Sequence, residues 1–244
     1  MTRCAVVGAG AWGTALSDLL ARNGHDVKIW AYEWDVVEAI NRSHENRRFL
    51  KGNKLDPAVS ACADIGEALD AAELVTLATP SHVLRSVVRA AKSSFPKGVP
   101  VVVASKGIEA ESLALMTDVA SSELPDSTII ALSGPSFAAE VVNRQPTAVV
   151  VASAKRDAAL FAQSIFSSNY FRTYTLSDVT GVEIGGALKN VIAVATGIAE
   201  GLDLGFNARA ALITRGLAEM TRLGTKLGAD PMTLAGLAGL GDLV

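Results

Sequence analysis

A Gly-x-Gly-x-x-Gly pattern near the start of the chain, at Gly8, Gly10 and Gly13, constrains the fold of the region around it. It follows a short apolar run, Cys4 to Val7, and leads into a stretch whose leucines recur with helical spacing. In this context the first glycine permits a tight turn, the second lets a pyrophosphate approach the backbone, and the third allows the helix to pack on the strand. The pattern therefore predicts a dinucleotide-binding turn.

Short apolar runs alternate with helical stretches along most of the chain. The runs cover residues 4–7, 27–30, 74–78, 101–104, 128–132 and 148–152. They are apolar throughout, as expected when helices cover both faces of a parallel sheet. Beyond about Leu176 two long helices are predicted, Val182 to Ala199 and Ala208 to Leu227. We therefore predict an α/β fold with a Rossmann-type, doubly wound, mostly parallel sheet in residues 1–178, followed by residues 179–244 as the N-terminal part of an all-helical second domain.

Composition and charge narrow the class of partner. The net charge is -3 and the charged residues are interspersed, so no basic stripe is available to bind nucleic acid. The two cysteines, Cys4 and Cys62, form no disulfide framework, and the first apolar run is too short for a signal peptide or a membrane span. The three histidines have no cluster of ligands at metal-binding spacing. We expect a cytoplasmic protein without membrane insertion or a metal, acting on a small molecule.

Glu33 bears on the choice of cofactor. It lies twenty residues past Gly13, just after the second apolar run, where a carboxylate can accept hydrogen bonds from the adenosine ribose. The sequence places no arginine directly beside it, since the nearest ones downstream are Arg42, Arg47 and Arg48. This favours NAD slightly over NADP, although an exposed glutamate in a loop is also common.

Two later segments are predicted to lie near the glycine turn. Lys106 follows the apolar run at 101–104, at the sheet edge where ligands bind in such folds. The turn from Gly134 to Ser136 resembles a serine-hydrolase nucleophile elbow, but Ala138 replaces its last glycine and no histidine partner is evident. The turn instead predicts an anion site or a plain helix cap.

Lys189 lies in a stretch that is apolar nearly all round, which predicts a buried helix. An unpaired buried ammonium is costly, so we expect this lysine to have a function. Gly185 and Gly186 share its face and leave space either for a ligand or for tight helix packing. Asp242 lies in a later stretch of small residues, where it could bind a substrate hydroxyl, bind Lys189 or cap a helix.

Five segments together resemble the bacterial NAD(P)-dependent glycerol-3-phosphate dehydrogenase family. They begin at Gly8 (GAGAWGTA), Ala104 (ASKGIE), Leu132 (LSGPSFA), Ala187 (ALKNV) and Gly239 (GLGDL). The resemblance spans the whole chain. It implies an oxidoreductase that interconverts sn-glycerol 3-phosphate and dihydroxyacetone phosphate with NAD(P), supplying glycerol 3-phosphate for phospholipid synthesis.

The resemblance also implies roles for individual residues. Those that would contact the dinucleotide, besides Gly8, Gly10, Gly13 and Glu33, are Ala11, Trp12, Tyr32, Ala138 and Lys106. Those that would bind substrate are Lys106, Gly134, Ser136, Lys189, Asn190 and Asp242. Within this set, Lys189 would accept the proton when glycerol 3-phosphate is oxidised, and Asp242 and Asn190 would orient the reacting oxygen.

Two departures from the family pattern accompany the resemblance. Ala11 stands where the family often has serine, which leaves the backbone donors intact. The family also continues past Gly-Asp-Leu into a Ser-Arg-Asn motif that binds the substrate phosphate, whereas this sequence ends at Val244. We therefore expect NADH binding, weak binding of the substrate phosphate with little turnover, and an apolar surface left exposed on the helical part.

Other functions remain open from the residues alone. A hydroxyacid or ketopantoate reductase type of dehydrogenase has the same cofactor turn and also uses a lysine on a helix. A non-catalytic nucleotide-binding module would keep the fold without the chemistry. The sequence is compatible with a homodimer but does not require one.

Overall fold

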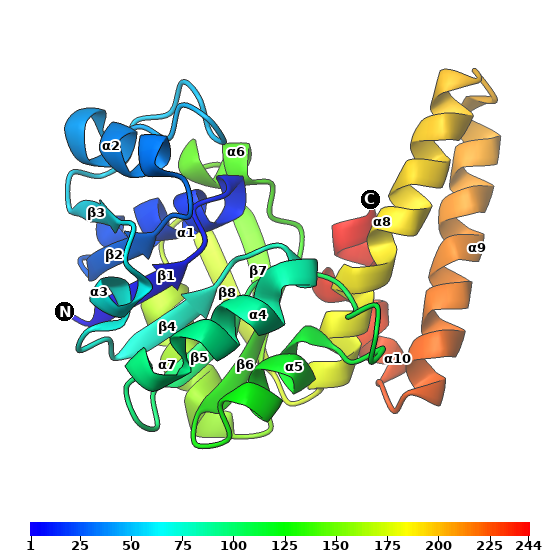
Figure 1. Cartoon of the computed structure of the whole chain (residues 1–244). Helices are drawn as coiled ribbons and strands as arrows, with labels where there is room; N and C mark the ends of the chain where they lie inside the picture. The colour runs from blue at the N-terminus through cyan, green and yellow to red at the C-terminus, as the bar shows by residue number, and fades with distance from the viewer.

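The structure is a computed structural model that describes all 244 residues. One eight-stranded sheet forms its centre (Figure 1), with the strand order β3-β2-β1-β4-β5-β6-β7-β8. The strands are β1 (Arg3–Val7), β2 (Asp26–Trp30), β3 (Val59–Cys62), β4 (Leu74–Leu77), β5 (Pro100–Val103), β6 (Thr128–Ser133), β7 (Thr147–Ala152) and β8 (Phe171–Leu176). Every neighbouring pair is parallel except β6 with β7.

Helices cover both faces of the sheet. In chain order the helices are α1 (Ala11–Arg22), α2 (Trp34–Ser43), α3 (Ile65–Leu69), α4 (Ser81–Ala91), the short η1 (Lys92–Ser94), α5 (Met116–Glu123), α6 (Ala138–Val142), α7 (Arg156–Phe166), α8 (Val179–Gly201), α9 (Gly205–Lys226), α10 (Pro231–Leu234) and the π-helical turn η2 (Leu237–Gly241), and α9 packs on α8 instead of the sheet. Successive residues of β1 face two different cores: Cys4 and Val6 pack with α1 and α7, whereas Ala5 and Val7 pack with α4 and α5. The predicted doubly wound, mostly parallel fold is confirmed.

Two strands, β3 and β8, are absent from the runs predicted from the sequence. β3 has only four residues, Val59–Cys62, and includes Ser60, so it lacks a continuous apolar run. β8 is an edge strand in which Phe171 and Thr173 are buried while Arg172 and Tyr174 are exposed. Its alternation is typical of a strand with one solvated face, and a search for uniformly apolar runs does not detect it.

The reversed strand direction between β6 and β7 determines at which edge of the sheet α8, the first helix of the helical part, begins. β7 and β8 are parallel to each other but run opposite to the first six strands. α8 follows β8 and therefore starts at the sheet edge opposite to the glycine turn. It then passes across β6, where Val182 packs with Ala131 and Val150, and Lys189 is carried back toward the other edge.

The prediction that α8 is buried throughout is wrong for its second half. Residues 181–186 are buried on the sheet, but Val191, Val194 and Ile198 are 67%, 63% and 59% exposed. This half extends beyond the sheet, and α9 packs along only one of its sides (Figure 1). The apolar pattern predicts a buried helix, but it does not show which neighbouring elements are present to bury it. Its exposed face agrees with the expectation of an apolar surface on the helical part.

α8 also has the length and apolar composition of a membrane-spanning helix. This is weak evidence for a span, because core helices of soluble proteins share both properties. The first half of α8 packs against β6 and η2.

Candidate active site

The glycine turn has a separate geometric requirement at each glycine. Gly8 has φ +113°, and a Cβ there would lie 2.9 Å from the carbonyl carbon of Ala78. A Cβ on Gly13 would lie 1.9 Å from the carbonyl oxygen of Gly8. No atom lies within 4 Å of the Cβ position of Gly10, and α1 begins at Ala11 without a side-chain cap. The first N–H groups of α1 thus face open space in which a phosphate can bind.

A groove of about 470 Å³ runs alongside this turn. Its lining includes Gly8, Gly10, Trp30, Tyr32, Glu33, Phe49, Thr79, Pro80 and His82. Trp12 lies next to the turn and buries its indole N–H without a partner inside the chain, and α6, which begins at Ala138, packs beside α1. The open Gly10, the uncapped helix and the mixed apolar and polar lining suit a dinucleotide.

Arg48 lies beside Glu33, contrary to the expectation that no arginine is adjacent. Its guanidinium is 3.9 Å from the Glu33 carboxylate and 3.4 Å from that of Asp35, and it also lies over the ring of Phe49. Glu33 and Arg48 are fifteen residues apart in the sequence. The segment of residues 44–58 folds back toward Glu33 and brings the two side chains together. Arg48 therefore places a cation beside Glu33, which weakens the preference for NAD over NADP expected from Glu33 alone.

Asp242 joins the two predicted lysines. One of its carboxylate oxygens accepts a hydrogen bond from Lys189 and the other accepts one from Lys106. The Asp242 side chain is 1% exposed, and those of Lys106 and Lys189 are 20% and 16% exposed. Three segments distant in the sequence thus form one buried cluster with two cations and one anion. Of the three possibilities left open for Asp242, the structure shows the contact with Lys189 and not an N-cap.

Lys106 also has a hydrogen-bond partner outside this cluster. It donates to the carbonyl oxygen of Gly134 at 3.2 Å, and Ser136 donates its hydroxyl to the same oxygen at 2.9 Å. Burial lowers the pKa of Lys106 to about 8, and the nearby Asp242 carboxylate opposes that shift. The ammonium and neutral forms of Lys106 are therefore both accessible near neutral pH.

The two glycines before Lys189 serve close packing. A Cβ on Gly185 would lie 2.1 Å from the carbonyl oxygen of Ala238, in η2, and one on Gly186 would lie 2.6 Å from the hydroxyl of Ser133. The second would also approach the Lys106 side chain at 3.4 Å. Asn190 is exposed, so the structure does not place it in the cluster with its neighbour Lys189.

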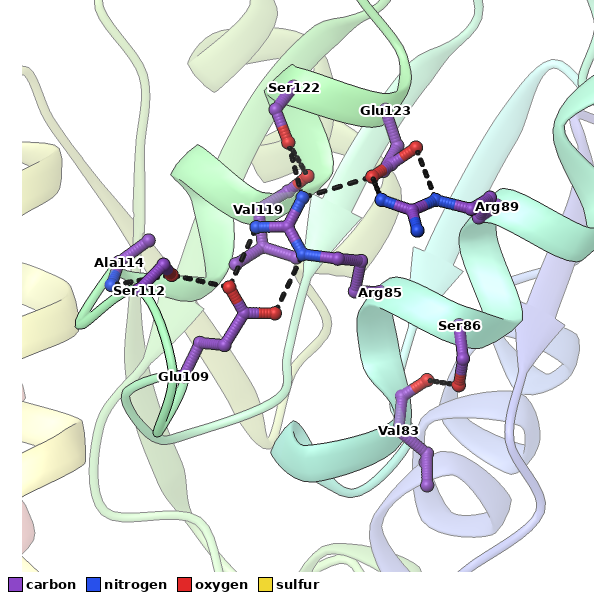
Figure 2. Close-up of polar contacts among 10 residues, drawn as sticks. All are labelled: Val83, Arg85, Ser86, Arg89, Glu109, Ser112, Ala114, Val119, Ser122 and Glu123. Atoms are coloured by element: carbon purple, nitrogen blue, oxygen red, sulfur yellow. Dashed lines mark hydrogen bonds and ion pairs between the residues drawn. The ribbon is translucent and has the colours of Figure 1, made fainter.

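An ion-pair cluster holds the loop that follows Lys106 (Figure 2). Arg85 of α4 forms two hydrogen bonds of 2.7 Å with Glu109, and it also contacts Glu123 of α5 at 3.0 Å. Arg89 binds Glu123 from the next turn of α4 at 2.7 Å. Hydrogen bonding to the arginines lowers the pKa of Glu109 and of Glu123 to about 2. The cluster therefore stays ionised across the physiological pH range.

Replacing Arg85 with alanine is expected to speed backbone hydrogen exchange in residues 107–115 about tenfold, because Glu109 loses its two-point contact and the loop opens more often. Hydrogen-exchange mass spectrometry would measure this. Arg89→Ala is the matched control, since Arg89 contacts Glu123 and not Glu109. Equal acceleration in both variants would contradict the assignment of the loop contact to Arg85.

Glu183 is a buried charged residue that is not among the site residues predicted from the sequence. This residue is in α8, is 9% exposed, and accepts hydrogen bonds from the N–H and hydroxyl groups of Thr117. It also lines a small cavity of about 10 Å³ together with Lys106, Ser133 and Gly186. The criterion that identified Lys189, a charged residue in an apolar helix, applies equally to Glu183. Glu183 also lies within the helix predicted for Val182 to Ala199, so the same signal could have identified it.

Comparison with known proteins places this geometry in a family. The model of the NAD-dependent glycerol-3-phosphate dehydrogenase N-terminus matches residues 3–159, and that of the C-terminus matches residues 178–244. The glycerol-3-phosphate dehydrogenase [NAD(P)+] of Myxococcus xanthus is 51% identical over 245 residues, which cover 99% of this chain and 73% of that protein. The corresponding protein of Geobacter metallireducens is 52% identical over 98% of this chain and 72% of its own length.

Solved structures agree with the sequence comparison. The crystal structure of glycerol-3-phosphate dehydrogenase from Coxiella burnetii superimposes with a TM-score of 0.95 at 39% identity, covering 99% of this chain and 74% of that one. A pyrroline-5-carboxylate reductase from the same organism has a TM-score of 0.56 at 15% identity, which indicates a shared fold alone. The chain therefore belongs to the NAD-dependent glycerol-3-phosphate dehydrogenase family.

Proposed function

We propose that this protein interconverts dihydroxyacetone phosphate and sn-glycerol 3-phosphate with NAD or NADP. The observation that carries the proposal is the buried Asp242 carboxylate, which binds both Lys106 and Lys189. Residues 1–178 would bind the dinucleotide, and residues 179–244 would contribute Lys189 and Asp242. This division leaves the cofactor groove and the acid–base group on separate parts of the chain.

The glycine turn and its groove would hold the cofactor, with the pyrophosphate at the N-terminus of α1 and the adenosine ribose near Glu33. When bound, the reduced cofactor supplies the hydride that converts the C2 carbonyl of dihydroxyacetone phosphate to an alcohol carbon. Lys189 donates a proton from Nζ to the C2 oxygen, and in the reverse direction Nζ accepts that proton. Asp242 fixes the position of this amine through their hydrogen bond.

Lys106 and the turn at Gly134 would bind the anionic part of the substrate. In its ammonium form Lys106 presents a positive charge beside Lys189, and its link to the Gly134 carbonyl keeps that charge next to the Ser136 hydroxyl. Two cations around one carboxylate give the cluster a net positive charge. Such a cluster favours a phosphate ester over a neutral ketone.

A substrate comparison tests the proposal. Oxidation of NADH is measured with dihydroxyacetone phosphate, unphosphorylated dihydroxyacetone and ketopantoate, each in large excess. We expect a low rate that depends on dihydroxyacetone phosphate, with background rates for the other two. A preference for ketopantoate would assign the chain to another class of reductase. NADH binding without oxidation by any of the three would support a nucleotide-binding module.

For the cofactor, we propose that Arg48 permits NADP as well as NAD. Glu33 can bind the ribose hydroxyls of NAD, and Arg48 can turn from Glu33 and Asp35 to a 2′-phosphate. Arg48→Ala is expected to raise the Kd for NADPH about tenfold, since one partly exposed charge-assisted hydrogen bond is lost and two carboxylates are left facing the phosphate. The Kd for NADH should change less than about twofold, because no 2′-phosphate is present to lose that contact.

Fluorescence titration with both reduced cofactors measures this change. Arg42→Ala is the control, because Arg42 is highly exposed and pairs with Glu38 on the same helix instead of Glu33. If Arg48→Ala weakened NADH and NADPH equally, Arg48 would support the groove in general and would not recognise the 2′-phosphate.

A further inference from the structure

Glu183 connects the helix that carries Lys189 to the segment that carries Lys106. Its carboxylate accepts a hydrogen bond of 2.9 Å from the backbone N–H of Thr117 and another from the Thr117 hydroxyl. Thr117 is the second residue of α5 (Met116–Glu123), whereas Glu183 lies six residues before Lys189 on α8. The contact therefore joins the sheet domain to the helical part of the chain.

This contact supplies a cap that α5 lacks. The residue before the helix is Leu115, whose side chain cannot accept a hydrogen bond, and α5 has no side-chain cap of its own. The first N–H groups of a helix need acceptors, and a carboxylate is a strong one. Glu183 provides that acceptor from a residue 66 positions away in the sequence.

The capped end of α5 closes the loop that begins at Lys106. Arg85 holds the middle of this loop through Glu109, and Glu183 holds its far end through Thr117. Glu183, Gly186 and Lys106 also line the same small cavity, and a Cβ on Gly186 would lie 3.4 Å from the Lys106 side chain. A shift of α8 relative to α5 would therefore change the separation of Lys106 and Lys189.

We propose that Glu183 is a positioning residue: its hydrogen bonds to Thr117 set the placement of Lys106 relative to Lys189, so that Asp242 can bind both. Glu183 does not touch the reacting atoms in this role. The proposal rests on the proposed function for its kinetic test, but its structural test is independent of turnover.

The role requires hydrogen bonds and not a negative charge. Burial raises the pKa of Glu183 to about 7, and Asp118 contributes in the same direction while the bonds from Thr117 oppose the shift. The facing charged groups are Asp118 on α5 and Lys106 across the cavity. A protonated carboxyl group still accepts from the Thr117 N–H and donates to its hydroxyl oxygen, so a neutral amide can replace it.

Four variants test the proposal. Glu183→Ala removes both hydrogen bonds, and Glu183→Gln keeps an acceptor and a donor. Thr117→Val removes only the hydroxyl bond. Ile165→Ala, on the buried face of α7, serves as a control that lowers thermal stability without touching α5 or α8. For each we would measure KM for dihydroxyacetone phosphate, kcat, Kd for NADH, and hydrogen exchange in residues 106–117.

Glu183→Ala is expected to raise KM for dihydroxyacetone phosphate about tenfold and to speed exchange in residues 106–117 by a similar factor, with the Kd for NADH changed less than about twofold. Glu183→Gln should restore KM to within about threefold of the parent chain, because both hydrogen bonds can re-form. Thr117→Val should fall between the two.

Three outcomes would overturn the proposal: Glu183→Gln behaving like Glu183→Ala, Ile165→Ala reproducing the change in KM, or unchanged exchange in residues 106–117 of Glu183→Ala. Failure of the parent chain to oxidise NADH with dihydroxyacetone phosphate would count against the proposed function instead. The hydrogen-exchange comparison would then still decide the role of Glu183.

Discussion

Replacing Lys189 with methionine is expected to lower kcat for dihydroxyacetone phosphate reduction on the order of 10³-fold, the usual contribution of a positioned acid–base group. Methionine has a similar length and no proton to donate to the C2 oxygen. The Kd for NADH should stay within about twofold of the parent value, because the cofactor groove lies at the glycine turn and not on α8. Single-turnover oxidation of bound NADH, with dihydroxyacetone phosphate in large excess, separates the chemical step from substrate affinity.

Val191→Ala is the matched control for this experiment. Val191 lies two residues further along the same helix, and its side chain is exposed. Its variant should keep the parent rate, which would show that disturbing α8 is not enough to stop the reaction. A Lys189→Met variant with an undiminished single-turnover rate would assign the proton transfer to another group, for which Lys106 is the nearest candidate.

Asp242→Asn is expected to reduce both turnover and stability. The variant leaves Lys106 and Lys189 next to each other without the carboxylate that binds both. Removing one partner of a buried ion pair costs about 3–5 kcal/mol, and the orientation of the Lys189 amine is lost together with its hydrogen bond. We expect kcat to fall at least about 10²-fold.

The loss of stability in Asp242→Asn should depend on pH. The lowered pKa of Lys106 determines whether this loss grows or shrinks as the pH rises. Its pKa of about 8 lies below the ordinary value of 10.5 for lysine, so the ammonium form is disfavoured in the folded chain. That penalty is fully present below about pH 8 and shrinks as pH rises toward 10.5. Asp242 opposes the shift, so its removal enlarges the penalty and lowers the pKa of Lys106 further.

Urea unfolding of Asp242→Asn at pH 6 and pH 9.5 checks this dependence. We expect the difference in unfolding free energy from the parent chain to be larger at pH 6. Asp157→Asn, which changes an exposed carboxylate at the start of α7, should show a small difference at both values. A larger loss at pH 9.5 than at pH 6 would contradict the assignment of the penalty to the lysine charge.

The sequence predicted the fold well where local patterns decide the structure. The glycine turn, the strand before it and the leucines of α1 all follow from short-range spacing, and Leu16, Leu19 and Leu20 are fully buried. β8 was missed because its alternating burial reflects a position at the sheet edge, which is a tertiary property. The exposure of Val191 and Val194 was mispredicted for the same reason: apolar side chains predict burial, but neighbours decide it.

The sequence predicted the individual residues of the site, but it did not predict which of them contact one another. Lys106, Lys189 and Asp242 were each named from the sequence, yet only the fold shows one carboxylate between two ammonium groups. Arg48 was dismissed because of its distance along the chain, and the loop after α2 returns it to Glu33. Thr117 carries no chemical signal by itself. Its importance comes from the buried Glu183 that caps its helix.

The reversed direction of β7 and β8 has a consequence for the length of α8 before Lys189. The chain enters this helix at the edge of the sheet opposite to the glycine turn, and the ten residue-to-residue steps from Val179 to Lys189 advance the lysine about 15 Å along the axis. One inserted residue would rotate Lys189 by about 100°, away from Asp242, while four would return it to within about 40° of its direction but move it about 6 Å further. No short insertion satisfies both conditions. Among members of this family the number of residues between the start of α8 and the lysine should therefore be invariant, while surface loops elsewhere vary in length.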